Sequence, residues 1–114
     1  MLHLILVLIF QLYLGVDCAP SSAKVLQLPG LVFKANFNHY AGQLNASSDQ
    51  YQHYFQYWLL ESQNNPKTDP LMVWLQGGPG CSSLGGQFEE VGPFRVNHDG
   101  KTLFENPFSW NKVL

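Results

Sequence analysis

The sequence is poor in charge, and this limits what the chain can bind. Charged residues make up 12% of the 114 residues and the formal net charge is −2, so no basic field indicates nucleic-acid binding. The His, Cys, Asp and Glu residues show no spacing typical of metal ligands, and no cofactor motif is complete, so we expect neither a metal nor a cofactor. Hydrophobic residues at 46% and aromatic residues at 14% indicate a packed core. We find no internal repeat and no second domain.

The first 18 residues contain no Lys or Arg and are almost wholly apolar. The apolar run is shorter than the about 20 residues that a membrane-spanning helix needs, and small side chains near its end permit cleavage before Ala19. We therefore predict a signal peptide at residues 1–18, followed by a polar linker at residues 19–25. An uncleaved anchor and a buried core helix are the alternatives. A signal peptide implies the secretory pathway, with the lysosome or the extracellular space as destination.

A glycine-rich turn at residues 77–80 follows an apolar run at residues 71–75. The run is typical of a strand buried on both faces inside an α/β sheet. Ser82 and Ser83 are suited to cap a helix that begins at Leu84. This order of strand, glycine turn and helix brings backbone N–H groups close to whatever binds there. The apolar face of the expected helix consists of Leu84, Phe88 and Val91.

Several interpretations of the turn compete. A phosphate loop fails because Gly86 and Gln87 stand where Lys and Ser or Thr would be needed. A dinucleotide-binding fingerprint is incomplete, because Ser83 stands where its third glycine would be needed. An oxyanion hole, in which an N–H of the turn stabilises the charge of a tetrahedral intermediate, fits the pattern. A tight connection without any ligand fits it equally well on spacing alone.

The sequence around the turn, W-L-Q-G-G-P-G-C-S-S-L at residues 74–84, resembles a tract of the serine carboxypeptidases, the family of cathepsin A. That tract usually reads W-L-N-G-G-P-G-C-S-S. Similarities continue on both sides, in the family's order, over roughly residues 26–114. They lie at residues 28–31, 39–44, 54–62, 92–94 and 106–111. The resemblance implies the α/β class and an α/β-hydrolase fold, which needs a much longer chain. We therefore expect residues 26–114 to be a truncated N-terminal portion holding the first strands of the central sheet.

The resemblance also implies roles for four residues around the turn. The backbone N–H of Gly78 would form half of an oxyanion hole, and Gly77 would present its backbone to the C-terminal carboxylate of a peptide substrate. The family's Asn that donates its amide to this carboxylate is replaced by Gln76, whose extra methylene displaces the amide. Glu90 aligns with a family glutamate near the same carboxylate, where its protonated form would donate a hydrogen bond. By residue type alone, Glu90 is an exposed helix acid.

Neither Ser82 nor Ser83 is predicted to be a nucleophile, because the tract lacks the last glycine of G-x-S-x-G. The family places its nucleophile in a later G-E-S-Y tract and its catalytic Asp and His later still, and these tracts are absent from the 114 residues. The histidines match none of the family's catalytic positions, and we expect His39 and His53 to be surface or core residues of strands. The four are His3, His39, His53 and His98. The 114-residue chain by itself is therefore expected to be inactive.

Two cysteines are present, Cys18 and Cys81. Cys18 is expected to leave with the signal peptide, which leaves Cys81 alone. The resemblance implies a disulfide between Cys81 and a cysteine far downstream, and that partner is absent from the sequence. A cysteine nucleophile is the rival interpretation, but no histidine partner is evident.

Two hairpins are expected. Residues 40–44 and 51–60 are rich in β-type side chains and flank a polar connection. Residues 94–96 and 101–104 flank an Asp-Gly turn. The first connection contains the acceptor sequence Asn-Ala-Ser, and in a secreted chain this predicts glycosylation of Asn45.

These observations together predict the N-terminal portion of a serine carboxypeptidase. The complete enzyme would release C-terminal residues from peptides through a Ser-His-Asp triad and an acyl-enzyme. Its partners would be peptide or protein substrates with a free C-terminus, and the full-length enzyme could form a homodimer. One alternative is a catalytically inactive secreted fragment, short isoform or binding protein. Another is an acyltransferase on the same scaffold, in which an alcohol intercepts the acyl-enzyme.

Overall fold

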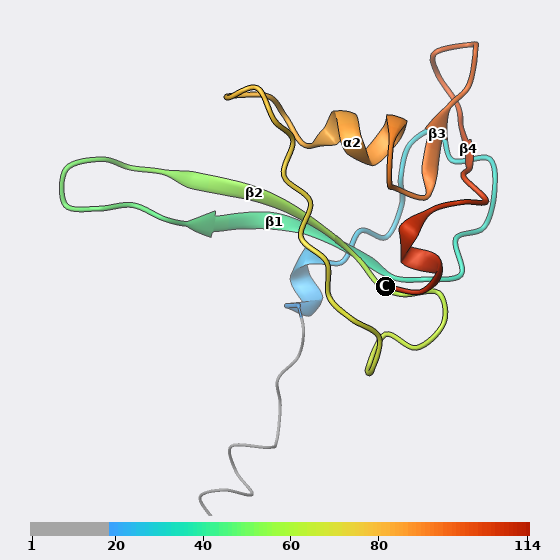
Figure 1. Ribbon diagram of the computed structural model, residues 1–114, viewed down its shortest axis with the longest axis horizontal. Coiled ribbons are helices and arrows are strands. Elements are labelled where there is room, and N and C mark those ends of the chain that lie inside the picture. The colour runs from blue at the N-terminus through green and yellow to red at the C-terminus, as the bar shows by residue number, and fades with distance from the viewer. Residues whose placement is uncertain (1–18) are drawn as a thin grey trace, which may run out of the picture.

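The computed structural model describes residues 19–114, which form two two-stranded antiparallel sheets and one α-helix (Figure 1). The predicted signal peptide, including His3 and Cys18, lies outside the described residues. Within the described range, no helix is long and apolar enough to cross a membrane. The elements, with η for a 3-10 helix, are η1 (Ser21–Ala23), β1 (His39–Asn45), β2 (Tyr54–Leu60), α2 (Leu84–Glu89), β3 (Phe94–Val96), β4 (Leu103–Glu105) and η2 (Trp110–Lys112).

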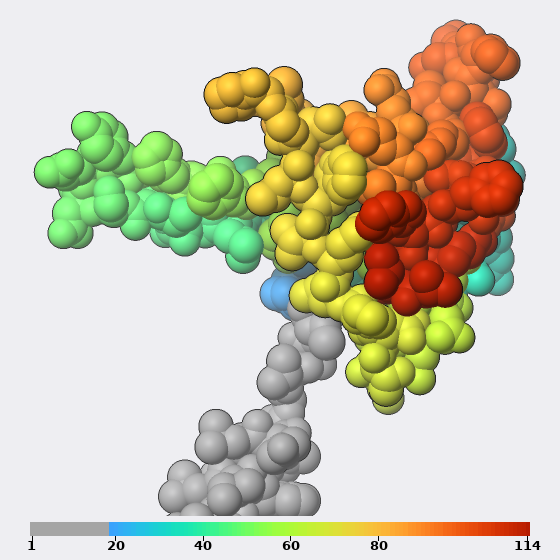
Figure 2. Space-filling model, in the orientation of Figure 1, coloured from blue at the N-terminus to red at the C-terminus, as the bar shows by residue number. Residues whose placement is uncertain are grey.

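Both predicted hairpins are confirmed. Strands β1 and β2 pair antiparallel with His39 opposite Leu60 and Asn45 opposite Tyr54, and β3 pairs antiparallel with β4. The aromatic and aliphatic side chains of β2 favour this extended, paired state. The first hairpin projects from the rest of the chain as an arm (Figures 1 and 2). His53, expected in a strand, lies instead in the connection that precedes β2.

The core is a cluster of aromatic rings around Phe94, whose side chain is fully buried. The ring of Trp58 stacks on that of Phe94, with centroids 5.7 Å apart, and His39 lies at the same distance. Phe33 and Phe37 add rings at 6.1 and 5.9 Å. Such ring pairs add to the free energy gained by burying apolar area. The cluster therefore joins β1 and β2 to β3.

His39 is a neutral member of this cluster. Its Nδ1 accepts a hydrogen bond of 3.0 Å from Trp58 Nε1, which requires an unprotonated nitrogen at that position. Burial also lowers the pKa of His39, because the charged imidazolium would lose its hydration. The expectation that His39 is a core or surface residue of a strand is thus resolved in favour of the core.

The last ten residues contain η2 and connect the two sheets through hydrogen bonds. Asn106 Nδ2 donates to the carbonyl oxygen of Gly92 at 2.8 Å. Asn111 Nδ2 donates to the carbonyl oxygen of Glu61 at 3.1 Å, beyond the end of β2. Both asparagines are buried, and buried polar groups persist only when they are paired. These bonds therefore fix the chain after β2 and the chain before β3 relative to η2.

The prediction that residues 71–75 form a strand buried on both faces is wrong for this chain. The segment pairs with no strand among residues 19–114. Its exposure alternates, as in an extended chain, and the side chains of Leu71, Val73 and Leu75 are 79%, 74% and 81% exposed. Burial on both faces needs neighbouring strands and a covering layer on each side. The described residues supply contacts on one side only.

Helix α2 begins at Leu84 as predicted, but its capping and its buried face differ from expectation. Ser83 makes no capping hydrogen bond through its side chain. Leu84 is 45% exposed, and the buried helix residues are Gly86 and Gln87. Phe88 does pack as expected, with its ring edge-on to Trp58 at 5.8 Å. The helix is turned so that Gly86 and Gln87, rather than Leu84, face the body of the chain.

Candidate active site

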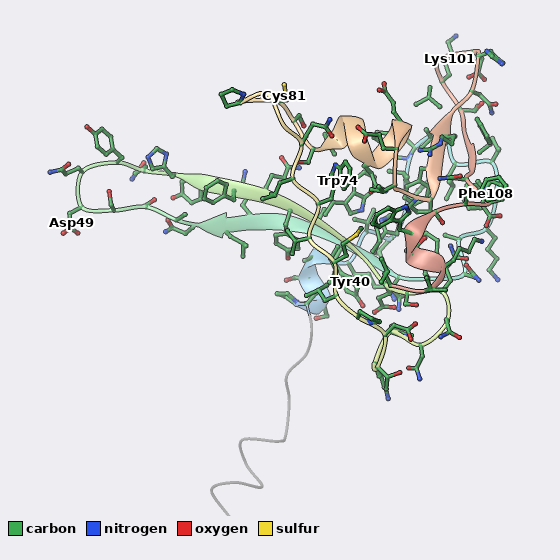
Figure 3. All side chains as sticks on the ribbon, viewed as in Figure 1. Tyr40, Asp49, Trp74, Cys81, Lys101 and Phe108 are labelled. Atoms are coloured by element: carbon green, nitrogen blue, oxygen red, sulfur yellow. The ribbon has the colours of Figure 1, made fainter. Side chains whose placement is uncertain are left out.

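The glycine turn at residues 77–80 lies between the unpaired segment and α2 and is exposed throughout. Figure 3 shows Cys81, the residue after this turn, on the part of the chain that projects from the body. Cys81 is exposed and forms no disulfide within residues 19–114. The Gly78–Pro79 peptide bond is cis. The turn therefore presents backbone, rather than bulky side chains, to the surroundings.

Gly78 is held in a conformation that only glycine adopts readily. Its φ is +155°, and a Cβ at this position would lie 2.8 Å from the sulfur of Cys81, closer than real Cβ contacts. Within the described part of the chain, no backbone or side-chain acceptor bonds to the Gly78 N–H. This N–H is thus a donor without an acceptor among residues 19–114.

Gln76 is the centre of a small hydrogen-bond network. Its side-chain oxygen accepts from Trp74 Nε1 at 3.1 Å, and its Nε2 donates to Glu90 Oε1 at 3.1 Å. Its backbone N–H donates to Ser83 Oγ, also at 3.1 Å. The indole fixes which end of the amide faces the carboxylate, because an indole N–H can only donate. The structure therefore brings together Gln76 and Glu90, which the family resemblance places at one carboxylate-binding site.

Gly86 makes this approach of α2 to Gln76 possible. A Cβ at Gly86 would overlap Trp74 Nε1 and lie 2.9 Å from Gln76 Oε1. Glu90 follows one turn later, its N–H donating to the Gly86 carbonyl at 3.0 Å, and residues four apart share one helix face. Arg95 Nη2 donates to the Glu90 carbonyl oxygen at 2.6 Å. Close packing at Gly86 thus sets the position of the Glu90 carboxylate.

Trp74 and Gly86 are site residues that the sequence reasoning did not single out. Trp74 is held by an edge-on contact with Trp110 of η2, at 6.4 Å between ring centroids, and Figure 3 shows it beside α2. A signal for Gly86 does exist. A glycine inside a helix of six residues costs helix stability, and such a cost indicates that something packs closely there.

The two serines that follow the turn, Ser82 and Ser83, have hydrogen-bond partners within the chain. Ser83 Oγ accepts from the Gln76 N–H, and Ser82 Oγ accepts from the Leu84 N–H at 3.3 Å. No histidine of residues 19–114 hydrogen-bonds to either hydroxyl. The other described histidines, His53 and His98, are exposed in the two hairpin connections. The described residues therefore show no Ser-His pair.

The remaining surroundings of Gln76 and Glu90 are open. A Cβ placed on Gly77 would meet no atom within 4 Å, so a ligand could approach this backbone without obstruction. No group of three or more metal-ligating side chains occurs in residues 19–114. The described groups that the site offers for hydrogen bonding are thus the Gln76 amide, the Glu90 carboxyl group and the Gly78 N–H.

Comparison with known proteins shows similarity to serine carboxypeptidases. A family model described as serine carboxypeptidase matches residues 29–114. The Caenorhabditis elegans serine carboxypeptidase ctsa-3.1 is 60% identical over 89 residues, which is 76% of this chain and 15% of that protein. The lysosomal protective protein of Mus musculus is 46% identical over 97 residues, 85% of this chain and 20% of that protein. The serine carboxypeptidase-like 26 protein of Arabidopsis thaliana is 47% identical over 93 residues, which is 79% of this chain and 20% of that protein. The chain thus spans a fifth or less of these relatives' lengths.

Proposed function

The chain belongs to the serine carboxypeptidase family, and from this premise we propose that it supplies the oxyanion and carboxylate-binding part of a carboxypeptidase active site. Membership implies the α/β-hydrolase fold, of which the described residues form few strands and one short helix. The complete site would release C-terminal residues from peptides or proteins through an acyl-enzyme. The nucleophile, Asp and His would come from tracts that the 114 residues do not contain.

The observation that carries this proposal is the 3.1 Å hydrogen bond between Gln76 Nε2 and Glu90 Oε1. The amide nitrogen has two N–H groups, so one can hold Glu90 while the other reaches a substrate. A substrate carboxylate beside an ionised Glu90 would be repelled, and this repulsion favours the protonated acid. Protonated Glu90 then donates a hydrogen bond to the same carboxylate. Gln76 thereby keeps the function of the family's Asn despite its longer side chain.

The backbone of the glycine turn supports the second half of the proposal. The Gly78 N–H has no acceptor among the described residues, and its neighbour Gly77 leaves open space on that side. A fixed N–H donor stabilises the negative charge of a tetrahedral intermediate more than that of the ground-state carbonyl. Gly78 would therefore contribute one donor of an oxyanion hole, and a second donor would come from elsewhere in the complete enzyme.

The place of action is part of the proposal. One relative is named lysosomal protective protein, and the apolar residues 1–18 have the length of a signal peptide. We therefore infer import of this chain into the secretory pathway, with the lysosome or the extracellular space as its destination. The 114 residues alone should show no peptidase activity. Hydrolysis of a blocked dipeptide by the purified chain, abolished by a serine-directed inhibitor, would refute this.

A chimera tests the proposed function directly. Residues 29–114 would replace the aligned segment of the mouse lysosomal protective protein, and hydrolysis of a blocked dipeptide would be measured for the free acid and for the C-terminal amide. We expect hydrolysis of the acid. Glu90→Ala should lower kcat/KM for the acid by about 10- to 100-fold, the value of a hydrogen bond to a charged group. Glu89→Ala, at the neighbouring exposed position, is the matched control. A folded but inactive chimera, or equal effects of the two substitutions, would overturn the proposal.

The acyltransferase alternative uses the same Gly78 donor and differs in what intercepts the acyl-enzyme. The pairing of Gln76 with Glu90 favours recognition of a free carboxylate, and hence the peptidase. Product analysis of the chimera in the presence of an alcohol separates the two. Free acid as the main product supports the peptidase, and ester as the main product supports the acyltransferase.

A further inference from the structure

The tip of the first hairpin carries a feature that the carboxypeptidase site does not use. Asn45, the last residue of β1, begins the sequence Asn-Ala-Ser, and no other Asn in the chain starts such a triplet. Residues 43–56 are all exposed. Figure 2 shows the hairpin reaching away from the bulk of the molecule, so the tip is open to a large enzyme from several sides.

The conformation at the tip leaves the nitrogen of Asn45 available. Asn45 Oδ1 accepts the Ser47 N–H at 2.9 Å, which forms an Asx turn. Ser47 Oγ accepts the His53 N–H from the opposite side of the connection at 3.0 Å. Asn45 Nδ2 has no hydrogen-bond partner among residues 19–114. The amide oxygen is thus engaged and polarised, while the nitrogen is left to react.

An aromatic residue, Tyr54, lies opposite Asn45 in the hairpin. Tyr54 is opposite Asn45 in the β1–β2 register, and opposite residues of an antiparallel pair point to the same face with Cβ atoms about 5 Å apart. The Tyr54 side chain is 56% exposed. Phe55, by contrast, pairs with Leu44 and points to the other face. Tyr54 therefore offers an apolar ring on the face from which Asn45 projects.

We propose that Asn45 carries an N-linked glycan and that the first sugar of this glycan packs on the ring of Tyr54. The C–H groups of a sugar and the face of a phenol ring can remove apolar surface from water together. The inference rests on the proposed import into the secretory pathway and does not depend on catalysis. It also assigns a role to an exposed tyrosine that has no part in the aromatic core.

The modification is a group transfer with a defined balance. Asn45 Nδ2 attacks the anomeric carbon of an oligosaccharide carried on a lipid pyrophosphate, and a nitrogen–carbon bond forms. The bond between that carbon and the phosphate oxygen breaks, and the lipid pyrophosphate leaves with the electron pair. The proton lost from Nδ2 passes to a base of the transferring enzyme. No oxidation or reduction takes place.

The site is tested by cell-free translation of the full 114-residue chain with endoplasmic-reticulum microsomes. Protection from added protease reports import, and a gel shift reversed by an Asn-glycan-cleaving enzyme reports the glycan. We expect a shift for the wild type, its loss in Asn45→Gln and Ser47→Ala, and its retention in the neighbouring control Ser48→Ala. Protected chain without a shift would overturn the proposed glycan.

Failure of import is a separate outcome. Unprotected wild-type chain would contradict the secretory proposal, and residues 1–18 would then be replaced by the leader of a known secreted protein. If the re-directed chain is protected and shifted, Asn45 is a glycan acceptor although its own leader is not functional. If the re-directed chain is protected and unshifted, the glycan proposal is wrong.

The contact with Tyr54 is tested by NMR of the glycosylated chain, which needs no global unfolding measurement. A ring current from Tyr54 should shift the proton signals of the first sugar upfield. Tyr54→Ala should return these signals to the positions of a free glycan, and Phe55→Ala, on the opposite face, should leave them shifted. Equal signals in the wild type and Tyr54→Ala would rule out the packing.

Discussion

Strand β2 and the segment at residues 71–75 have similar compositions but different structures. Both are rich in aromatic and aliphatic residues. Strand β2 pairs along its whole length with β1, whereas the segment pairs with nothing among residues 19–114. The partner of β2 lies nearby in the chain, across a short connection. A β-type composition thus favours an extended backbone, and a strand forms only where a partner is present.

The same difference affects the candidate active site. Gln76 follows the unpaired segment directly, so no sheet holds it from the strand side. Its hydrogen-bond partners are Trp74 of the segment itself and, from the α2 side, Ser83 and Glu90. The hydrogen bond between Gln76 and Glu90 therefore depends on the packing of α2 in this chain.

The largest expected effect comes from removing the ring at the centre of the core. Phe94→Ala should reduce the free energy of unfolding by about 3–5 kcal/mol, because the fully buried ring leaves a cavity. Leu75→Ala removes a side chain that is 81% exposed, so a change within about 0.5 kcal/mol is expected. Urea denaturation followed by tryptophan fluorescence measures both. Equal losses would mean that residues 71–75 are buried in solution, which would contradict the difference between this segment and β2.

A smaller effect is expected at the contact between α2 and the segment. Gly85→Ala should raise stability by up to about 1 kcal/mol, because alanine favours the helix and its methyl group would meet open space. Gly86→Ala should lower stability by about 1–3 kcal/mol, because its methyl group would overlap Trp74 Nε1. In the chimera, Gly86→Ala should also raise KM for the free-acid substrate. A stabilising Gly86→Ala would show that α2 does not lie against Trp74.

The smallest effect is a dependence of stability on pH through His39. Burial lowers the pKa of this imidazole in the folded chain, while the unfolded chain titrates near about 6.5. Above the pKa of the unfolded chain, His39 is neutral in both states and its contribution to stability is complete. As the pH falls below it, the unfolded state binds the proton first, so stability decreases until the lowered folded pKa is reached.

Urea midpoints at neutral pH and at mildly acidic pH measure this dependence. His39→Gln keeps an acceptor for Trp58 Nε1 and should reduce the loss of stability on acidification. His53→Gln, at an exposed position, should leave the loss unchanged. If both substitutions behave alike, the protonation of His39 is not what couples pH to the core.

The features that the sequence predicts well are local or carried by a long motif. The two hairpins follow from alternating β-type runs and turn residues close together in the chain. The proximity of Gln76 and Glu90 follows from the family resemblance, although the extra methylene of Gln76 was expected to displace its amide. In the structure that amide still reaches Glu90 Oε1.

The features that the sequence misses depend on contacts between distant segments. The buried Asn111 bonds to Glu61, 50 positions earlier, and no local pattern reports such a partner. The rotation of α2 is decided by the close approach of Gly86 to Trp74 rather than by the apolar spacing of Leu84 and Phe88. Residues 71–75 have the composition of a buried strand, but composition cannot show whether the covering layers are present.

Backbone hydrogen exchange can establish whether residues 71–75 are an extended segment without partner strands beside the Gln76–Glu90 pair, which we propose to bind a carboxylate. In the 114-residue chain the amides of residues 71–75 should exchange rapidly, while those amides of β2 that bond to β1 should be protected. In an active chimera with the mouse relative, residues 71–75 should become protected as well. Protection of residues 71–75 in the 114-residue chain, or rapid exchange there in an active chimera, would contradict the account.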